Sequence, residues 1–72
     1  KKKIGIAVSE RRRLMLVSQV ELAERCRINR SNLCGIEKGL RPVSLAMLER
    51  IAQSLDCEIS ITLKARPKEN AG

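Results

Sequence analysis

The spacing of apolar residues along the chain predicts four helices followed by one strand. Apolar residues recur at three or four positions from residue 4 to about residue 15, which predicts a first helix. The clearest stripe of this kind follows Pro42 and a capping Ser44 and predicts a fourth helix. The run "CEISITL" then alternates with the period of a strand. The inward residues predicted for the two helices are Ile4, Ala7, Val8 and Leu14 in the first, and Leu45, Leu48, Ile51, Ala52 and Leu55 in the fourth.

A capping box predicts the start of a second helix. In "SQVE" the Ser18 hydroxyl accepts from the amide of Glu21, whose carboxylate reaches back, so the helix begins at Gln19. We expect its inner side to hold Val20, Leu22, Ala23 and Cys26.

A third helix follows after a few residues. Asn29 is a capping residue, so this helix runs from Arg30 to about Lys38, and Gly39 ends it because glycine tolerates a left-handed backbone. Arg27 occupies the turn between the two short helices.

The composition predicts a small aliphatic core and a dimer. A chain of 72 residues without Phe, Tyr or Trp forms one domain whose burial is marginal, so further burial through self-association is favoured. A lone strand leaves its backbone unpaired. We therefore expect residues 58–63 to pair with the same strand of a second subunit through Ile59, Ile61 and Leu63. The alternative is a tail that lies on the core without pairing. Residues 65–72 are predicted to be a disordered tail.

The charge favours a polyanionic partner. Fifteen Lys and Arg against eight Asp and Glu leave a net charge of +7. Single strands and RNA are usually bound by stacking bases on aromatic rings, which are absent here, so duplex DNA is favoured. No apolar run reaches the roughly 18 residues of a membrane span, and the basic residues do not face large apolar anchors, so we expect a cytoplasmic protein without a membrane partner.

The cysteines and acids do not suggest a metal site or an enzyme. Three cysteines form no CxxC pair and there is no His, so we expect no metal and no cofactor, with reduced thiols. Cys26 and Cys57 fall at apolar positions and should be buried, whereas Cys34 should be partly exposed. With Asp56 as the only Asp and no nucleophile beside a base, an enzyme is disfavoured.

The two short helices have the spacing of a helix-turn-helix. A small residue allows two helices to cross over a short turn, and apolar anchors fix their angle, so that the second helix projects from the body. A projecting helix fits the DNA major groove. The small and apolar residues are Leu22, Ala23, Cys26, Ile28, Leu33 and Ile36.

The segment "SQVELAERCRINRSNLCGIEKGLRPVSLAMLERIAQSL" resembles the lambda-repressor-like (Xre-type) helix-turn-helix family, densely over residues 18–55 and more loosely over 4–16. The strand after the fourth helix resembles HipB-type antitoxins, in which strands from two subunits pair. The resemblance implies a mostly α fold, with a four-to-five-helix lambda-repressor-like domain over residues 1–64 and the helix-turn-helix at 18–38. One C-terminal β-strand would pair across a dimer.

The third helix is expected to read DNA. Its first turn presents Arg30, Ser31 and Asn32 to base edges, and Arg30 is the best candidate because its guanidinium can bind guanine in a bidentate way. Gly35, one turn further along, leaves a bare spot that a groove wall or a thymine methyl could approach. The alternatives are a solvated arginine and simple tolerance of glycine.

Other polar residues are expected to position the domain on phosphates. By the resemblance, Gln19 touches phosphate at the start of the second helix, with help from Ser18, and Asn29 lies near phosphates or base edges. Lys38 and Arg41 would clamp the opposite side. Arg12 and Glu37 match a family pair that bridges the first and third helices, and Arg12 could also approach phosphate.

Two positions depart from the family pattern. Arg27 stands where the family commonly has glycine, and a left-handed residue with a side chain costs about 1 to 2 kcal/mol. Arg11 replaces a commonly apolar residue, which puts the packing of the first helix in question.

The leading interpretation is a homodimeric, sequence-specific regulator that binds double-stranded DNA and represses at a palindromic operator. Activation by a controller-type protein of the same fold is an open alternative. A second interpretation is an antitoxin whose main role is to neutralise a toxin protein, for HipB-type proteins a kinase.

Overall fold

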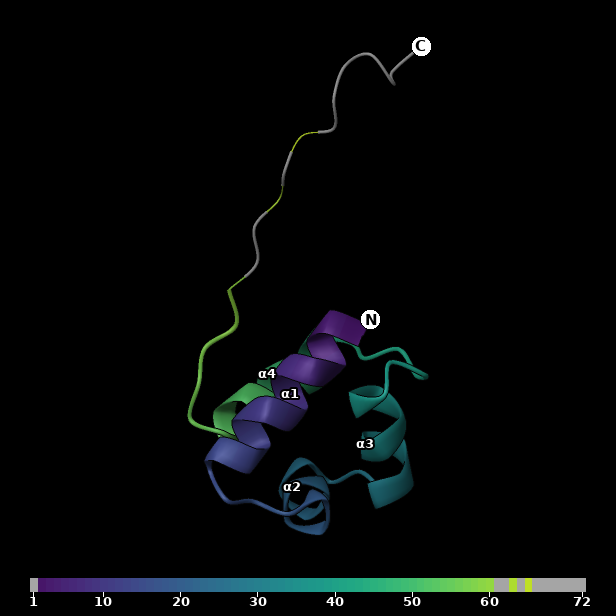
Figure 1. The fold of residues 1–72 in the computed structure, drawn as a ribbon, viewed down its shortest axis with the longest axis vertical. Coiled ribbons are helices and arrows are strands. Elements are labelled where there is room, and N and C mark those ends of the chain that lie inside the picture. Colours follow the sequence, from purple (N-terminus) through teal and green to yellow (C-terminus); the bar gives the residue numbers. More distant parts are fainter. Residues whose placement is uncertain (1, 61–62, 64, 66–72) are drawn as a thin grey trace.

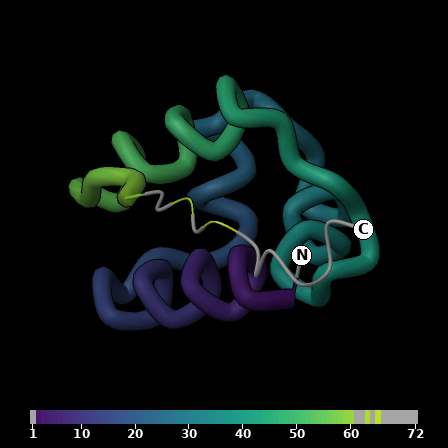
Figure 2. The backbone as a smooth tube through the Cα atoms, turned by 90° about the horizontal axis from the view of Figure 1, so that it is seen from above, coloured from purple at the N-terminus to yellow at the C-terminus, as the bar shows by residue number. Residues whose placement is uncertain are grey.

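Four helices form the regular structure of residues 2–60, 63 and 65, which are the residues that the computed structural model describes (Figure 1). They are α1 (Lys2–Leu14), α2 (Gln19–Cys26), α3 (Arg30–Glu37) and α4 (Leu45–Ser54). Helix α2 packs against both α3 and α4, and α1 packs against α3. Figure 2 shows α1 and α4 along opposite edges of the molecule, with α3 beside the first turns of α1.

The core is aliphatic, as the composition predicts. Its largest fully buried side chains come from α2, α3, α4 and the residue that follows α4; they are Leu22, Leu33, Ile51, Leu55 and Cys26. Val8 from α1 and Val17 from the loop between α1 and α2 belong to the same cluster. The helix-turn-helix spacing therefore does place its apolar anchors inside.

Local capping fixes where three helices begin, and each predicted start is confirmed. The Ser18 hydroxyl accepts a hydrogen bond from the Glu21 amide at 3.0 Å, and Ser44 does the same for the Met47 amide at 3.1 Å. The return half of the capping box does not form, because the Glu21 carboxylate instead binds Arg25, one turn later. The cap of α3 belongs to the functional surface and is described below.

Of the four inward residues predicted for α1, Val8 is buried, whereas Ile4, Ala7 and Leu14 are exposed. The other buried residues of α1 are Gly5 and Arg12. They face inward because Gly5 lies against the end of α3 and Arg12 binds a carboxylate there. A Cβ atom on Gly5 would overlap the carbonyl oxygens of Ile36 and Glu37.

Three other predictions of burial are wrong. Val20 is 51% exposed, because Leu22, Ala23 and Cys26 supply the inner side of α2. Leu45 is 55% exposed in the first turn of α4. Cys57 is exposed because the chain turns away after Asp56, whose φ is 52°. The predictions for the other thiols are confirmed, with Cys26 buried and Cys34 half-buried.

Hydrogen bonds explain both departures from the family pattern. Arg11 donates hydrogen bonds to the carbonyl oxygens of Leu55 at 3.0 Å and Asp56 at 2.9 Å, so it closes the end of α4 rather than disturbing α1. Arg27 does adopt the left-handed conformation, with φ 59°, and its amide bonds back to the last turn of α2.

The predicted strand over 58–63 is not formed at residues 58–60 or at Leu63, which have no regular structure in the single chain. Ile59 is half-buried and Leu63 is exposed, while Ile61 lies outside the described residues. Pairing of this segment across a dimer stays a prediction. Of the predicted tail, Ala65 is exposed and residues 66–72 lie outside the described residues.

Candidate nucleic-acid interface

Helix α3 exposes a polar side at the surface. Leu33 and Ile36 are its buried residues and fix which side faces inward. Arg30 and Ser31 are exposed, and the half-buried residues on the helix are Asn32, Cys34, Gly35 and Glu37. Residues three or four positions apart share a helix face, so Ser31 and Gly35 lie on one side, directed away from the core.

The start of α3 is fixed by Asn29. The Asn29 side-chain oxygen accepts from the Asn32 amide at 2.8 Å and from the Ser31 hydroxyl at 3.0 Å. Asn29 therefore holds the backbone and the Ser31 side chain in place.

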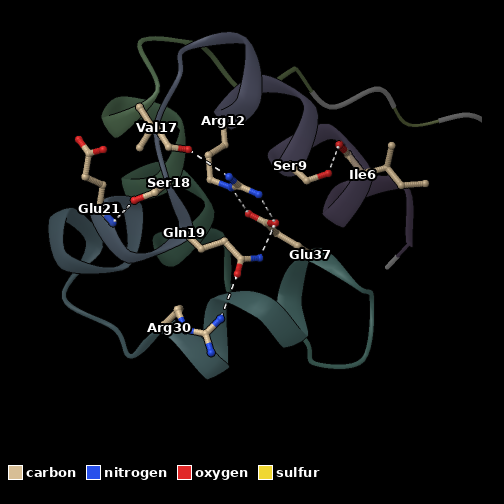
Figure 3. Close-up of polar contacts among 9 residues, drawn as sticks. All are labelled: Ile6, Ser9, Arg12, Val17, Ser18, Gln19, Glu21, Arg30 and Glu37. Carbon is tan, nitrogen blue, oxygen red and sulfur yellow. Dashed lines mark hydrogen bonds and ion pairs between the residues drawn. The ribbon is translucent and has the colours of Figure 1, made fainter.

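A hydrogen-bonded network joins α1, α2 and α3 beneath this surface (Figure 3). Arg12 donates from Nε and Nη2 to the two carboxylate oxygens of Glu37, at 2.8 and 3.0 Å, and from Nη1 to the Val17 carbonyl oxygen. Gln19 donates to the same carboxylate at 3.0 Å. In turn, the side-chain oxygen Oε1 of Gln19 accepts from the Arg30 guanidinium at 3.4 Å. The network therefore runs from buried Arg12 outward to exposed Arg30.

The pair at the centre of the network is charged in the folded protein. Burial raises the pKa of Glu37, but hydrogen bonds from Arg12 and Gln19 and the charges of Arg12 and Arg13 outweigh it, so this pKa lies below its ordinary value. The pKa of Arg12 is raised, because its hydrogen bond to Glu37 outweighs the opposing effect of burial. A bidentate guanidinium–carboxylate contact fixes orientation as well as charge. This contact orients α3 relative to α1.

Three residues that were predicted to contact DNA make hydrogen bonds within the protein instead of pointing freely into solvent. Arg12 is 8% exposed and all three of its donor groups point inward, so its place in the fold is beneath the surface. Gln19 uses both ends of its amide within the network. Ser18 is exposed while its hydroxyl caps α2.

Two basic residues follow the C-terminal end of α3. Gly39 adopts φ +74° and its amide donates to the Ile36 carbonyl oxygen at 3.0 Å, which ends the helix as predicted. Lys38 and Arg41 are exposed on either side of this glycine, and the Arg41 side chain lies across Gly35. Gly35 is thus covered by an arginine rather than left bare.

Sequence reasoning missed two residues that shape this end of the surface. Gly5 allows α1 to approach the last carbonyls of α3, and Lys2 lies beside Gly39. The packing of α1 against α3 brings both to this place from far away in the sequence, so no local pattern marks them.

Several arginine side chains of the described residues are bonded to groups of the protein itself. Arg11, Arg25 and Arg50 donate to carbonyl oxygens of the chain, and Arg12 is buried. In residues 2–60, 63 and 65, no group of His, Cys, Asp and Glu side chains could hold a metal ion. None of the helices in this part of the chain has the length and apolar character needed to cross a membrane.

A short helix that turns its polar side outward, held by a capped turn to the helix before it, defines a helix-turn-helix domain. The chain belongs to the helix-turn-helix family, whose model matches residues 2–61.

The solved structures that are similar to the chain include two regulators. The restriction-modification controller protein C.AhdI from Aeromonas hydrophila is 37% identical with a TM-score of 0.76, and the match covers 79% of this chain and 86% of that one. The clp gene regulator ClgR from Corynebacterium glutamicum is 28% identical with a TM-score of 0.77. That match covers 78% of this chain and 60% of ClgR, so the chain spans less than two thirds of ClgR. No curated protein sequence matches the chain significantly.

Proposed function

We propose that this protein is a transcriptional regulator that binds double-stranded DNA by placing α3 in the major groove. The family match and the likeness to two regulators support a DNA-binding regulator. The observation that carries the proposal is the outward polar side of α3, with exposed Arg30 held through Gln19 to the buried Arg12–Glu37 pair. Such pre-positioning reduces the freedom that the arginine loses on binding.

The first turn of α3 supplies the base contacts in this proposal. Arg30 binds a guanine edge, and the shorter Ser31 and Asn32 contact neighbouring bases. Asn29 acts by fixing this turn, as its two hydrogen bonds support.

Phosphate contacts flank the reading helix. Ser18 and Gln19 begin α2, where the free amides favour an anion, and Lys38 holds the other side. Arg12 acts from below by orienting Glu37 and Gln19, which its burial supports. These contacts give affinity that depends on salt but carry little sequence information.

The regulator acts as a homodimer on a palindromic operator. Two α3 helices related by a two-fold axis meet half-sites about 34 to 36 Å apart. The dimer forms through strands over 58–63, with Ile59, Ile61 and Leu63 on the apolar side. Repression follows when the dimer occupies a promoter. The likeness to a restriction-modification controller protein is equally compatible with activation. A regulator of this kind works in the cytoplasm and needs no cofactor.

An antitoxin role is the second candidate. It is favoured by the alternating segment "CEISITL", which resembles the strand of HipB-type proteins. A kinase toxin that co-purifies with the protein and loses activity in the complex would support this role.

The test of the proposal compares two substitutions, Arg30→Ala and Lys38→Ala. A cognate duplex is selected from random DNA, and affinities are measured by fluorescence anisotropy against a scrambled duplex at several salt concentrations. Arg30→Ala should weaken cognate binding more than scrambled binding, by about 1 to 3 kcal/mol of discrimination. Lys38→Ala should weaken both about equally and reduce the salt dependence. Equal losses for Arg30→Ala on both duplexes would remove its reading role.

A further inference from the structure

The Arg41 side chain occupies the space that a side chain at position 35 would need. A Cβ atom built on Gly35 would lie 2.8 Å from both Cγ and Cδ of Arg41 and 3.0 Å from its Nε. These distances are far below van der Waals contact. The aliphatic part of the Arg41 side chain is therefore packed directly on the α3 backbone, at a site that only glycine leaves open.

The backbone holds Arg41 at the same place. The Gly35 carbonyl oxygen accepts from the Leu40 amide at 2.8 Å and from the Arg41 amide at 3.2 Å. Together with left-handed Gly39, these bonds fold the chain back along the last turn of α3. Pro42 follows and disfavours a helical backbone at Arg41. Arg41 is thus attached to Gly35 by its main chain and by its side chain.

The site lies on the outward side of α3. Gly35 follows Ser31 by one turn, and the buried Leu33 and Ile36 point the other way. Arg41 itself is exposed, and among the residues that the structure describes its guanidinium binds none. The guanidinium groups of Arg11 and Arg12, in contrast, are bonded to groups of the fold. Arg41 is therefore available to a ligand that binds the side of α3 on which Ser31 and Gly35 lie.

We propose that Arg41 is a second base-reading side chain, carried on α3 by Gly35, rather than a clamp on phosphate. This inference rests on the function proposed above. Gly35 serves it by admitting the arginine and not by admitting a thymine methyl. The guanidinium enters the major groove beside α3 and binds the acceptor edge of a guanine with two donors.

Arg30 and Arg41 would read different base pairs. Gly35 follows Arg30 by five positions, which is about 7.5 Å along a helix. Successive bases of one strand are about 3.4 Å apart along the duplex axis. If α3 lies along the groove, the two arginines therefore meet different base pairs of one half-site.

The experiment measures affinity for the selected duplex and for a set of duplexes that each carry one substituted base pair. Arg41→Ala should weaken cognate binding by roughly 5- to 150-fold, the range of one bidentate arginine–base pair, and abolish preference at one base pair. Preference at the base pair read by Arg30 should remain. Arg41→Lys keeps the charge but loses the planar fork, so it should lose the same preference.

Gly35→Ala tests the carrying role, because it displaces the arginine without removing its charge. It should lose preference at the same base pair as Arg41→Ala, and the double variant should lose no more there. Circular dichroism establishes that the variant is folded. If Gly35→Ala does not fold, the two Arg41 variants decide the question. Lys38→Ala is the matched control, since it removes a charge from the same segment and should keep every base preference.

The outcomes separate this inference from the function on which it rests. If Arg41→Ala weakens cognate and scrambled duplexes equally and every base preference survives, Arg41 is a phosphate clamp and the inference fails while the proposed function stands. Preserved preference in Gly35→Ala alongside lost preference in Arg41→Ala overturns the carrying role. If random DNA yields no preferred sequence with the unaltered protein, both fail together.

Discussion

Replacing Glu37 with glutamine removes the carboxylate that Arg12 binds and leaves a buried guanidinium without its counter-charge. The two side chains are 10% and 6% exposed, so the pair is largely shielded from water. Removing one partner of a buried pair costs about 3 to 5 kcal/mol, because the other charge stays buried. Glutamine keeps one acceptor oxygen for Arg12, so we expect the lower end, about 3 kcal/mol.

A loss of this size is large for a chain of 72 residues. Domains are stable by about 0.05 to 0.15 kcal/mol per residue, which is roughly 4 to 11 kcal/mol here. In thermal unfolding, about 3 kcal/mol corresponds to roughly 12 to 24 °C in a domain of this size. Because the protein has no Trp or Tyr, unfolding in urea is followed by the circular dichroism of the helices.

The matched control is Glu21→Gln. Glu21 pairs with Arg25 at 3.2 Å, but these side chains are 55% and 47% exposed, so the change should cost less than about 0.5 kcal/mol. Equal effects of the two substitutions would refute the view that the buried network holds α3 in place.

The same pair predicts how stability depends on pH. The folded-state pKa of Glu37 lies below its ordinary value, so the stabilisation is present at neutral pH and is lost as the pH falls from about 4.5 through the folded pKa. Glu37→Gln should lose this part of the acid dependence. An unchanged acid transition in the variant would show that Glu37 does not contribute to it.

Three further changes, one of them with a matched control, test the packing, the cap and the dimer. Gly5→Ala should destabilise the fold by about 1 to 3 kcal/mol, because its methyl overlaps carbonyl oxygens of α3; an unchanged melting curve would contradict this. Asn29→Ala should cost about 1 kcal/mol of stability and also weaken cognate DNA binding, whereas Ser44→Ala should cost a similar stability and leave binding unchanged. Deleting residues 58–72 leaves the core intact and should give monomers in sedimentation; an unchanged mass would rule out pairing through that segment.

Short-range signals predicted much of the fold. Ser18, Asn29 and Ser44 each cap a helix through an amide three positions away, so the starts of α2, α3 and α4 could be read from neighbouring residues. Gly39 ends α3 for an equally local reason, its positive φ. The apolar anchors of the two short helices were also predicted, because a helix repeats its inward side within a few residues.

The errors concern residues whose position depends on distant parts of the chain. The inward side of α1 is set by Glu37, 25 positions after Arg12, and by the backbone at the end of α3. Apolar spacing alone therefore predicted that Leu14 faces the core and did not indicate Gly5. Arg11 put the packing of α1 in question, because its partners lie 44 and 45 positions away at the end of α4.

On the candidate surface, too, local features could be predicted from the sequence and long-range contacts could not. Exposure of Arg30 and Ser31 followed from the helical pattern, and Lys38 and Arg41, which the family resemblance places just beyond α3, are exposed as well. The contacts among these residues did not, because Gln19 meets Arg30 across the turn between two helices. Gly35 was predicted to be a bare spot, and the packing of Arg41 on it depends on how the chain folds back after Gly39.

The most direct test of the central claim is an NMR titration of the ¹⁵N-labelled protein with the duplex selected from random DNA. Placing α3 in the major groove predicts the largest amide shift changes from Asn29 to Gly35, with smaller changes at Gln19 and Arg41. Changes confined to α4 and to the outer side of α1, with the amides of α3 unmoved, would contradict it.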